Sequence, residues 1–122
     1  MTGIKIALQR AMRLEGAIGA AVVDFVSRMP LGTAGDPHGL DLDLAAHGDT
    51  DVVRAKLATL HLIGYTPERV EDILITLDTE YHLIRLLTRR PHEGLFFYLV
   101  LERGRADLDT VRKELHQIED LL

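Results

Sequence analysis

Apolar residues recur at helical spacing at both ends of the chain. Near the start, Ile4, Leu8 and Ala11 lie three or four residues apart, which predicts a helix of about four turns. Thr2 precedes this stripe and is a suitable N-cap. Near the end, Asp107 can cap a closing helix. The apolar face of that closing helix consists of Leu108, Val111, Leu115, Ile118 and Leu122.

Between the two terminal helices, the first pattern is that of a β-hairpin. Residues 17–26 (AIGAAVVDFV) are small or β-branched on both alternating faces, which is typical of an interior strand covered on both sides. Ser27 and Arg28 then form a tight turn, and residues 29–34 return as a second strand. Pro30 cannot donate a hydrogen bond to a neighbouring strand, so we expect this second strand at an edge of the sheet.

A long helical pattern follows from about Leu42 to Ile63, and Gly64 ends it. Gly48 either kinks this helix or delays its start. Apolar residues cover more than half of its circumference, whereas packing on one sheet needs a stripe of about 100°. A second surface therefore has to cover the rest, either another copy of the chain or, in a monomer, loops. The apolar residues are Ala45, Val52, Val53, Leu57, Leu60, Leu62 and Ile63.

Three further strand-like runs, at residues 70–77, 81–88 and 95–101, precede the closing helix. Short loops separate them, so antiparallel hairpins are the economical connection. The predicted order is helix, two strands, helix, three strands, helix.

Composition limits the class of protein. A chain of 122 residues with 47% hydrophobic and 27% charged residues predicts one globular domain, residues 1–122. A net charge of −5 with only three scattered lysines disfavours a nucleic acid partner. The absence of cysteine excludes disulfides and thiolate sites and fits the cytoplasm, and no segment resembles a signal peptide or a transmembrane helix.

Catalytic and cofactor motifs are missing from the sequence. The glycine-rich stretch GTAGDPHG has no lysine and does not match the spacing of a P-loop, so the chain is not itself a P-loop GTPase. Ser27 is the only serine, lies in a predicted turn and has no nucleophile context. We therefore expect no catalytic residue and no cofactor.

Two groups of polar residues could bind a metal ion, but simpler interpretations are favoured. His47 and Asp51 lie one helical turn apart, and no third ligand is visible nearby. Asp78, Glu80 and His82 share one side of a predicted hairpin, where carboxylates are usually solvated. The favoured interpretation of the first group is a solvated helix face of His47, Thr50, Asp51, Arg54 and His61.

Asp24 interrupts the otherwise apolar strand at residues 17–26. A functional acid is one interpretation. The favoured one places Asp24 near the strand end, where its carboxylate accepts backbone N–H groups of the following turn.

Four segments together resemble the roadblock, or dynein light chain, superfamily in its bacterial form. The similarity runs along nearly the whole chain and rests on the order of elements and the apolar patterning. Where many relatives have glycine after the turn serine, this chain has Arg28. The segments are residues 16–31 (GAIGAAVVDFVSRMPL), 42–57 (LDLAAHGDTDVVRAKL), 71–87 (EDILITLDTEYHLIRLL) and 94–103 (GLFFYLVLER).

The resemblance implies an α+β fold of the order α-β-β-α-β-β-β-α. A five-stranded antiparallel sheet would lie between the long helix on one face and the two terminal helices on the other. Roadblock-like proteins dimerise by pairing their long helices and joining sheet edges. In that arrangement the run at residues 70–77 is an edge strand without the prolines and inward charges that usually protect an edge, so we expect it to be paired.

For this chain, the resemblance and the helix pattern together predict a homodimer interface. Asp49 and Lys56 are seven residues apart on one helix face, and across a two-fold axis each Asp49 would meet the Lys56 of the other copy. The alternative is that both side chains reach water and the lysine stem covers apolar surface. The expected interface residues are Asp49, Val52, Val53, Lys56, Leu57, Leu60, Ile73 and Ile75.

Bacterial roadblock-like proteins often work with small Ras-like GTPases, as activators or scaffolds, and are not enzymes alone. The first functional hypothesis is therefore a homodimeric regulator or scaffold of such a GTPase, which would contact the outer surface of the paired helices through His47, Asp51, Arg54 and His61. An assembly scaffold with no nucleotide-dependent partner is the alternative. A small-molecule sensor is a third, but the chain has only three Phe, three Tyr and no Trp to line a pocket.

Overall fold

The computed structural model describes residues 2–35, 38–88 and 92–122, except for the side chain of Thr2, the predicted N-cap. It confirms the predicted order of helices and strands and adds one short 3₁₀ helix, η1. The elements are α1 (Thr2–Ala11), β1 (Ala17–Asp24), β2 (Met29–Gly35), α2 (Leu42–Leu62), η1 (Pro67–Arg69), β3 (Ile73–Thr76), β4 (Glu80–Leu87), β5 (Leu95–Glu102) and α3 (Leu108–Glu119).

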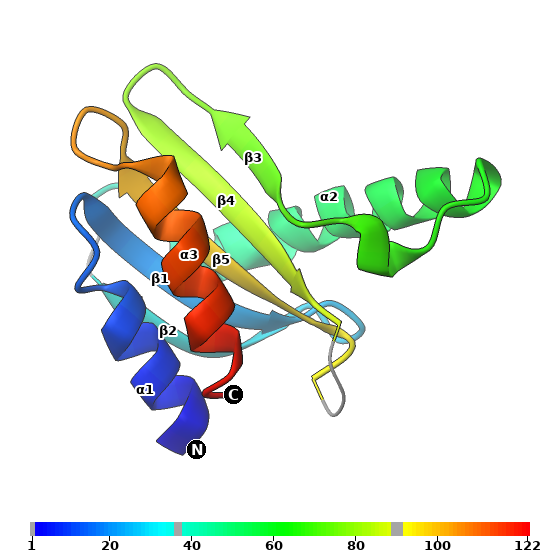
Figure 1. The fold of residues 1–122 in the computed structure, drawn as a ribbon, viewed down its shortest axis with the longest axis horizontal. Coiled ribbons are helices and arrows are strands. Elements are labelled where there is room, and N and C mark those ends of the chain that lie inside the picture. The colour runs from blue at the N-terminus through cyan, green and yellow to red at the C-terminus, as the bar shows by residue number, and fades with distance from the viewer. Residues whose placement is uncertain (1, 36–37, 89–91) are drawn as a thin grey trace.

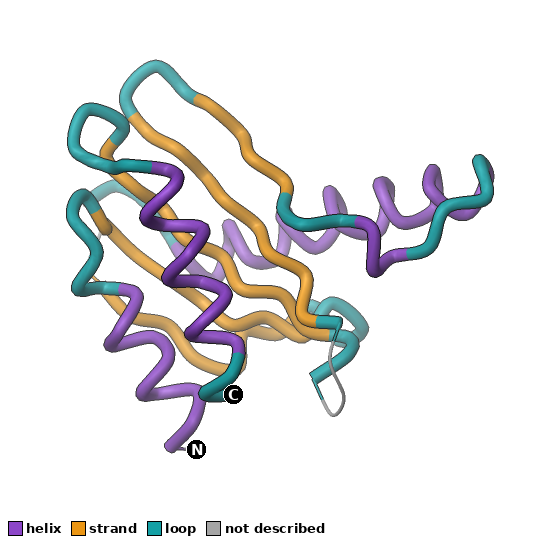
Figure 2. The backbone as a smooth tube through the Cα atoms, viewed as in Figure 1, coloured by secondary structure: helices purple, strands orange, loops and turns teal. Residues whose placement is uncertain are grey.

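The strands form one five-stranded antiparallel sheet in the order β2-β1-β5-β4-β3. As predicted, β1 is an interior strand, and β2 with its proline lies at an edge. Figure 1 shows α1 and α3 side by side on one face of the sheet and α2 on the other. The tube in Figure 2 shows the same layers without the ribbon.

Each face of the sheet has its own apolar core. Alternate residues of β5 serve the two cores, because successive side chains of a strand point to opposite faces. Phe97, Leu99 and Leu101 pack toward α1 and α3. Phe96, Tyr98 and Val100 pack toward α2. All six are at most 1% exposed, so β5 is the centre of the molecule.

Helix α1 is shorter than the sequence pattern predicts. It ends at Ala11 rather than near Gly16, because Arg13 and Leu14 donate their N–H groups three residues back and the chain turns into β1. At the other edge of this layer, a Cβ at Gly32 of β2 would lie 3.0 Å from Leu8 and 3.1 Å from Ile4. The missing side chain therefore lets α1 approach β2 closely.

Helix α2 begins with an N-cap that the sequence analysis did not identify. One carboxylate oxygen of Asp41 accepts hydrogen bonds from the N–H groups of Asp43 and Leu44 at 3.0 and 3.1 Å. The helix then runs through Gly48 without interruption. In Figure 1 its C-terminal half extends beyond the sheet. Within the described residues, no helix has the length and apolarity needed to cross a membrane.

Strand β3 is also shorter than predicted, spanning residues 73–76 rather than 70–77. η1 and the segment after it occupy the difference, and this segment is attached to α3. Arg112 donates two hydrogen bonds to the Asp72 carboxylate at 2.9 and 3.2 Å. The predicted cap of α3 is confirmed, since the Asp107 carboxylate accepts the N–H of Asp109 at 3.1 Å.

The two terminal helices are joined to each other. Arg10 of α1 donates two hydrogen bonds to the Glu114 carboxylate of α3, at 2.9 and 3.0 Å. The chain ends also meet, because a Cβ at Gly3 would lie 2.9 Å from the carbonyl oxygen of Leu121. Both termini therefore lie on the sheet face opposite α2 (Figure 1).

The most buried ion pair of the described residues gives a stability prediction. Arg85 of β4 and Glu119 of α3 are 2.9 Å apart, with side chains 11% and 5% exposed. Arg85→Met removes the guanidinium from a buried carboxylate and should lower the free energy of unfolding by about 3 kcal/mol. Urea denaturation at fixed protein concentration measures this. Arg10→Met, at the more exposed pair, is the matched control, and an equal loss in both variants would contradict the prediction.

Candidate functional site

The inner face of α2 belongs to the core of the chain itself. Val53 is fully buried and Leu60 is 7% exposed, both against the same chain, so neither offers surface to a second copy. Leu57 is half-buried and lines a small cavity with Phe25 and Leu86. These three predicted interface residues thus face inward, because the sheet needs a covering stripe along the whole inner side of the helix.

A shallow groove runs between α2 and the edge strand β3. It is lined by Val52, Ala55, Lys56 and Thr59 of the helix and by Ile73 of the strand. Ile75 lies on the same side of β3 as Ile73, because side chains alternate along a strand. Strand β3 pairs only with β4, so its outer edge has no strand neighbour. The structure thus brings four of the predicted interface residues together: Val52, Lys56, Ile73 and Ile75.

Along this groove α2 presents a stripe that we call the seam. Its residues alternate three and four positions apart, the spacing at which one helix packs against another in a coiled coil. They are small or apolar, and all but the half-buried first one are exposed. A Cβ built on the glycine of the stripe meets nothing within 4 Å. The seam consists of Ala45, Gly48, Val52, Ala55, Thr59 and Leu62.

Asp49 lies beside the seam, between α2 and the sheet. Its Oδ2 is buried and has no hydrogen-bond partner among the described residues. Burial raises the pKa of Asp49 to about 6, and the nearby His82 opposes this shift only in part. A carboxylate in this position is unfavourable at neutral pH unless a cation or donor reaches it.

Below Asp49 a chain of hydrogen bonds crosses the sheet. The Tyr98 hydroxyl lies 2.8 Å from Nδ1 of His82, and Nε2 of His82 lies 2.9 Å from a carboxylate oxygen of Glu80. Burial, followed by the charges of Asp49 and Glu80, raises the pKa of Tyr98. The interpretation of His82 as a solvated hairpin residue was wrong, because its side chain is only 16% exposed. Its alternation with Ile84, a buried residue on the same side of β4, was the available signal.

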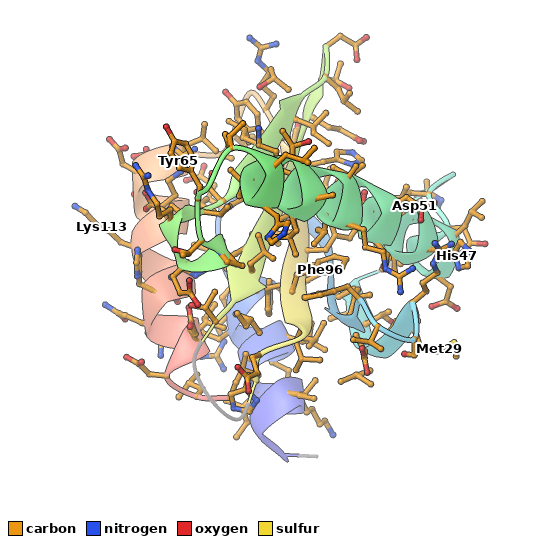
Figure 3. The ribbon with its side chains drawn as sticks, turned by 90° about the vertical axis from the view of Figure 1, so that its right-hand side faces the viewer. Met29, His47, Asp51, Tyr65, Phe96 and Lys113 are labelled. Carbon is orange, nitrogen blue, oxygen red and sulfur yellow. The ribbon has the colours of Figure 1, made fainter. Side chains whose placement is uncertain are left out.

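The outer face of α2 is fastened to the β1–β2 turn. Arg54 donates hydrogen bonds to the carbonyl oxygens of Phe25 and Val26 at 2.9 and 2.7 Å. Arg28 forms an ion pair with Asp51 at 2.8 Å and approaches His47 at 3.5 Å. Figure 3 shows His47 and Asp51 next to each other at this end of α2, with Met29 of the hairpin below them. Three of the four predicted partner-binding residues thus form one cluster with the hairpin.

His61, the fourth predicted partner-binding residue, is exposed in the last turn of α2, about two turns beyond Arg54. Asp51 pairs with a guanidinium, and no group of three potential metal ligands occurs in the parts of the chain that the structure describes. The favoured interpretation of Asp24 is confirmed. Its carboxylate accepts the N–H groups of Val26 and Ser27 at 2.8 and 3.3 Å.

Comparison with solved structures shows the class of fold. The sequence matches no protein-family model and no curated protein. The structure has the roadblock/LC7 fold: the Roadblock/LC7 domain from Streptomyces avermitilis superposes with a TM-score of 0.72 at 14% identity, covering 98% of this chain and 90% of that one. The predicted fold is thereby confirmed.

Two similar structures carry the name MglB. Myxococcus xanthus MglB superposes with a TM-score of 0.83 at 17% identity, covering 98% of this chain and 84% of that chain. The gliding protein MglB from Thermus thermophilus gives a TM-score of 0.82 at 18% identity, with 99% and 86% covered. At these identities the likeness concerns the fold.

The turn residue Arg28 gives the prediction of this section. It has a φ of +68°, and no other non-glycine residue among those described has a positive φ. Glycine adopts this conformation without the clash of a Cβ, which costs other residues about 1 kcal/mol or more. Arg28→Gly should therefore be about 1 kcal/mol more stable to urea than Arg28→Ala, since both lose the same ion pair. Equal stability of the two variants would show that the turn is not strained.

Proposed function

We propose that this chain is a homodimeric protein-binding module that regulates or scaffolds a small Ras-like GTPase. The observation that carries the dimer is the exposed seam of α2 lying beside the unpaired edge of β3. Two helices that pair along the seam and two β3 strands that pair edge to edge would cover both surfaces with one two-fold operation. Lys56 and Val52 would lie inside this interface, and Ile73 and Ile75 below it.

Small residues of the seam favour a helix as the covering element. Gly48 and Ala55 leave room for a second backbone, while Val52 and Leu62 supply apolar area. Strand β3 has neither proline nor an inward charge to prevent pairing. A second copy of the chain satisfies the helix and the strand at once.

The GTPase as partner rests on the roadblock fold together with the bacterial type of roadblock protein that the sequence resembles. The surface proposed for it is the cluster of His47, Asp51 and Arg54 with the β1–β2 hairpin, continued toward His61. This surface remains on the outer side when two helices pair along the seam. Exposed apolar side chains of Val26, Met29 and Leu44 accompany the cluster, as expected of a protein-binding surface. We propose a role in binding, without catalysis by this chain, in the cytoplasm.

Dimerisation is tested by two substitutions of the same residue type on the same helix. Ala55→Arg places a charge in the groove and should give a monomer by light scattering at micromolar concentration, whereas the wild type should show twice the chain mass. Ala58→Arg is the matched control, because Ala58 is exposed on the side of α2 away from β3. A wild-type monomer, or loss of the dimer in both variants, would count against the proposed interface.

GTPase binding is tested by calorimetry with the small Ras-like GTPases of the source organism. Each is loaded with GDP or with a non-hydrolysable GTP analogue and titrated with this chain. A regulator should bind one nucleotide state at least tenfold more tightly than the other, while equal affinities would favour the assembly scaffold instead. The chain alone should give no heat with GTP and magnesium, because it has no P-loop. Binding of GTP by the chain alone would contradict the binding-module proposal.

A further inference from the structure

Asp49 carries the one buried side-chain oxygen without a hydrogen-bond partner in residues 2–35, 38–88 and 92–122. Buried polar atoms in native proteins are nearly always paired, so an exception calls for a missing partner. The atom lies at the junction of α2 with the sheet, beside the groove to β3. Within the described chain, nothing donates to it.

The neighbouring groups of the same chain are already engaged or carry the wrong charge. His82 of β4 is held by Tyr98 of β5 on one ring nitrogen and by Glu80 on the other. Glu80 is an acid, and its charge, like that of Asp49, acts on Tyr98. The side chains of β3 on this face are Ile73 and Ile75, which bear no charge. The site therefore lacks a cation.

Lys56 is a cation without an anion. It lines the groove to β3 and makes no ion pair or hydrogen bond with any described residue. It lies two turns along α2 from Asp49, about 10 Å along the axis, on the same flank of the helix. Each chain thus presents one buried acceptor and one free ammonium on the surface that the proposed dimer would cover.

We propose that Asp49 is the acceptor for the Lys56 ammonium of a second copy, in two equivalent contacts that set the register of the dimer. This inference rests on the proposed homodimer. An antiparallel seam with its two-fold axis between Val53 and Arg54 places Val52 opposite Ala55 and Gly48 opposite Thr59 of the second copy. In that register Asp49 lies two residues, about 3 Å, from the position opposite Lys56 of the second copy. A lysine side chain spans this offset.

The pairing makes self-association depend on pH with a defined sign. In the single chain the pKa of Asp49 is about 6, because burial disfavours the carboxylate. An ammonium beside it would lower that pKa, so the dimer would bind fewer protons than two free chains near pH 6. Association should therefore strengthen as pH rises from 5 to 7 and weaken as pH falls. If the dimer only buried Asp49 further without a cation, its pKa would rise and the pH dependence would reverse.

Sedimentation equilibrium at pH 5, 6 and 7 tests this sign. The wild-type dissociation constant should fall at least tenfold from pH 5 to pH 7, since two carboxylates are involved. Asp49→Asn should remove most of this change, which separates Asp49 from other titrating groups such as His82. Lys56→Met should weaken the dimer at pH 7 at least tenfold, while Lys113→Met, a lysine on α3, should leave it unchanged. Circular dichroism confirms that each variant is folded.

A charge swap gives the decisive comparison. Lys56→Glu alone places two acids together and should give the weakest dimer, whereas Asp49→Lys combined with Lys56→Asp should recover at least tenfold of that loss. A swap no tighter than Lys56→Glu, or a dimer that weakens as pH rises, would overturn the pairing and leave the homodimer standing. A wild-type chain that is monomeric at every pH would overturn the homodimer itself.

Discussion

Burial of both faces of strand β5 is the constraint on which the rest of this molecule depends. Its side chains from Phe96 to Leu101 are almost completely covered, alternately by the two helical layers. A sheet with two apolar faces is stable in water only if both faces are covered. Helices α1 and α3 share one face, whereas α2 covers the other alone. One helix cannot cover a five-stranded sheet completely, so the surfaces open to other proteins lie on the α2 face.

Most of the fold could be predicted from the sequence, because periodicity reports which side of each element is buried. The two-sided apolar pattern of residues 17–26 identified an interior strand, and Pro30 identified an edge. Element ends were less accessible. Helix α1 stops at Ala11 because the chain must reach the start of β1, and β3 is shortened where Asp72 is held by Arg112. Both limits arise from contacts between distant parts of the chain, which local patterns do not contain.

The candidate site was predicted only in part, for the same reason. Helical spacing correctly placed Val52 and Lys56 beside the groove, but it gave no means of separating them from Val53 and Leu60, which the sheet of the same chain covers. The hydrogen bonds among Glu80, His82 and Tyr98 join two strands and depend on the register of β4 with β5. A single sequence does not show that register. The same holds for Arg28 and Arg54, whose partners lie on another element.

The meeting of the two chain ends on the α1 and α3 layer has a consequence for attached segments. Any domain or label joined to either end would emerge from the face opposite α2. Two copies joined at β3, with their long helices on one side of a continuous sheet, would direct all four ends to the other side. The helical side would then be a platform free of appendages, and whatever is tethered to the ends would be held a full sheet thickness away from a protein resting on α2.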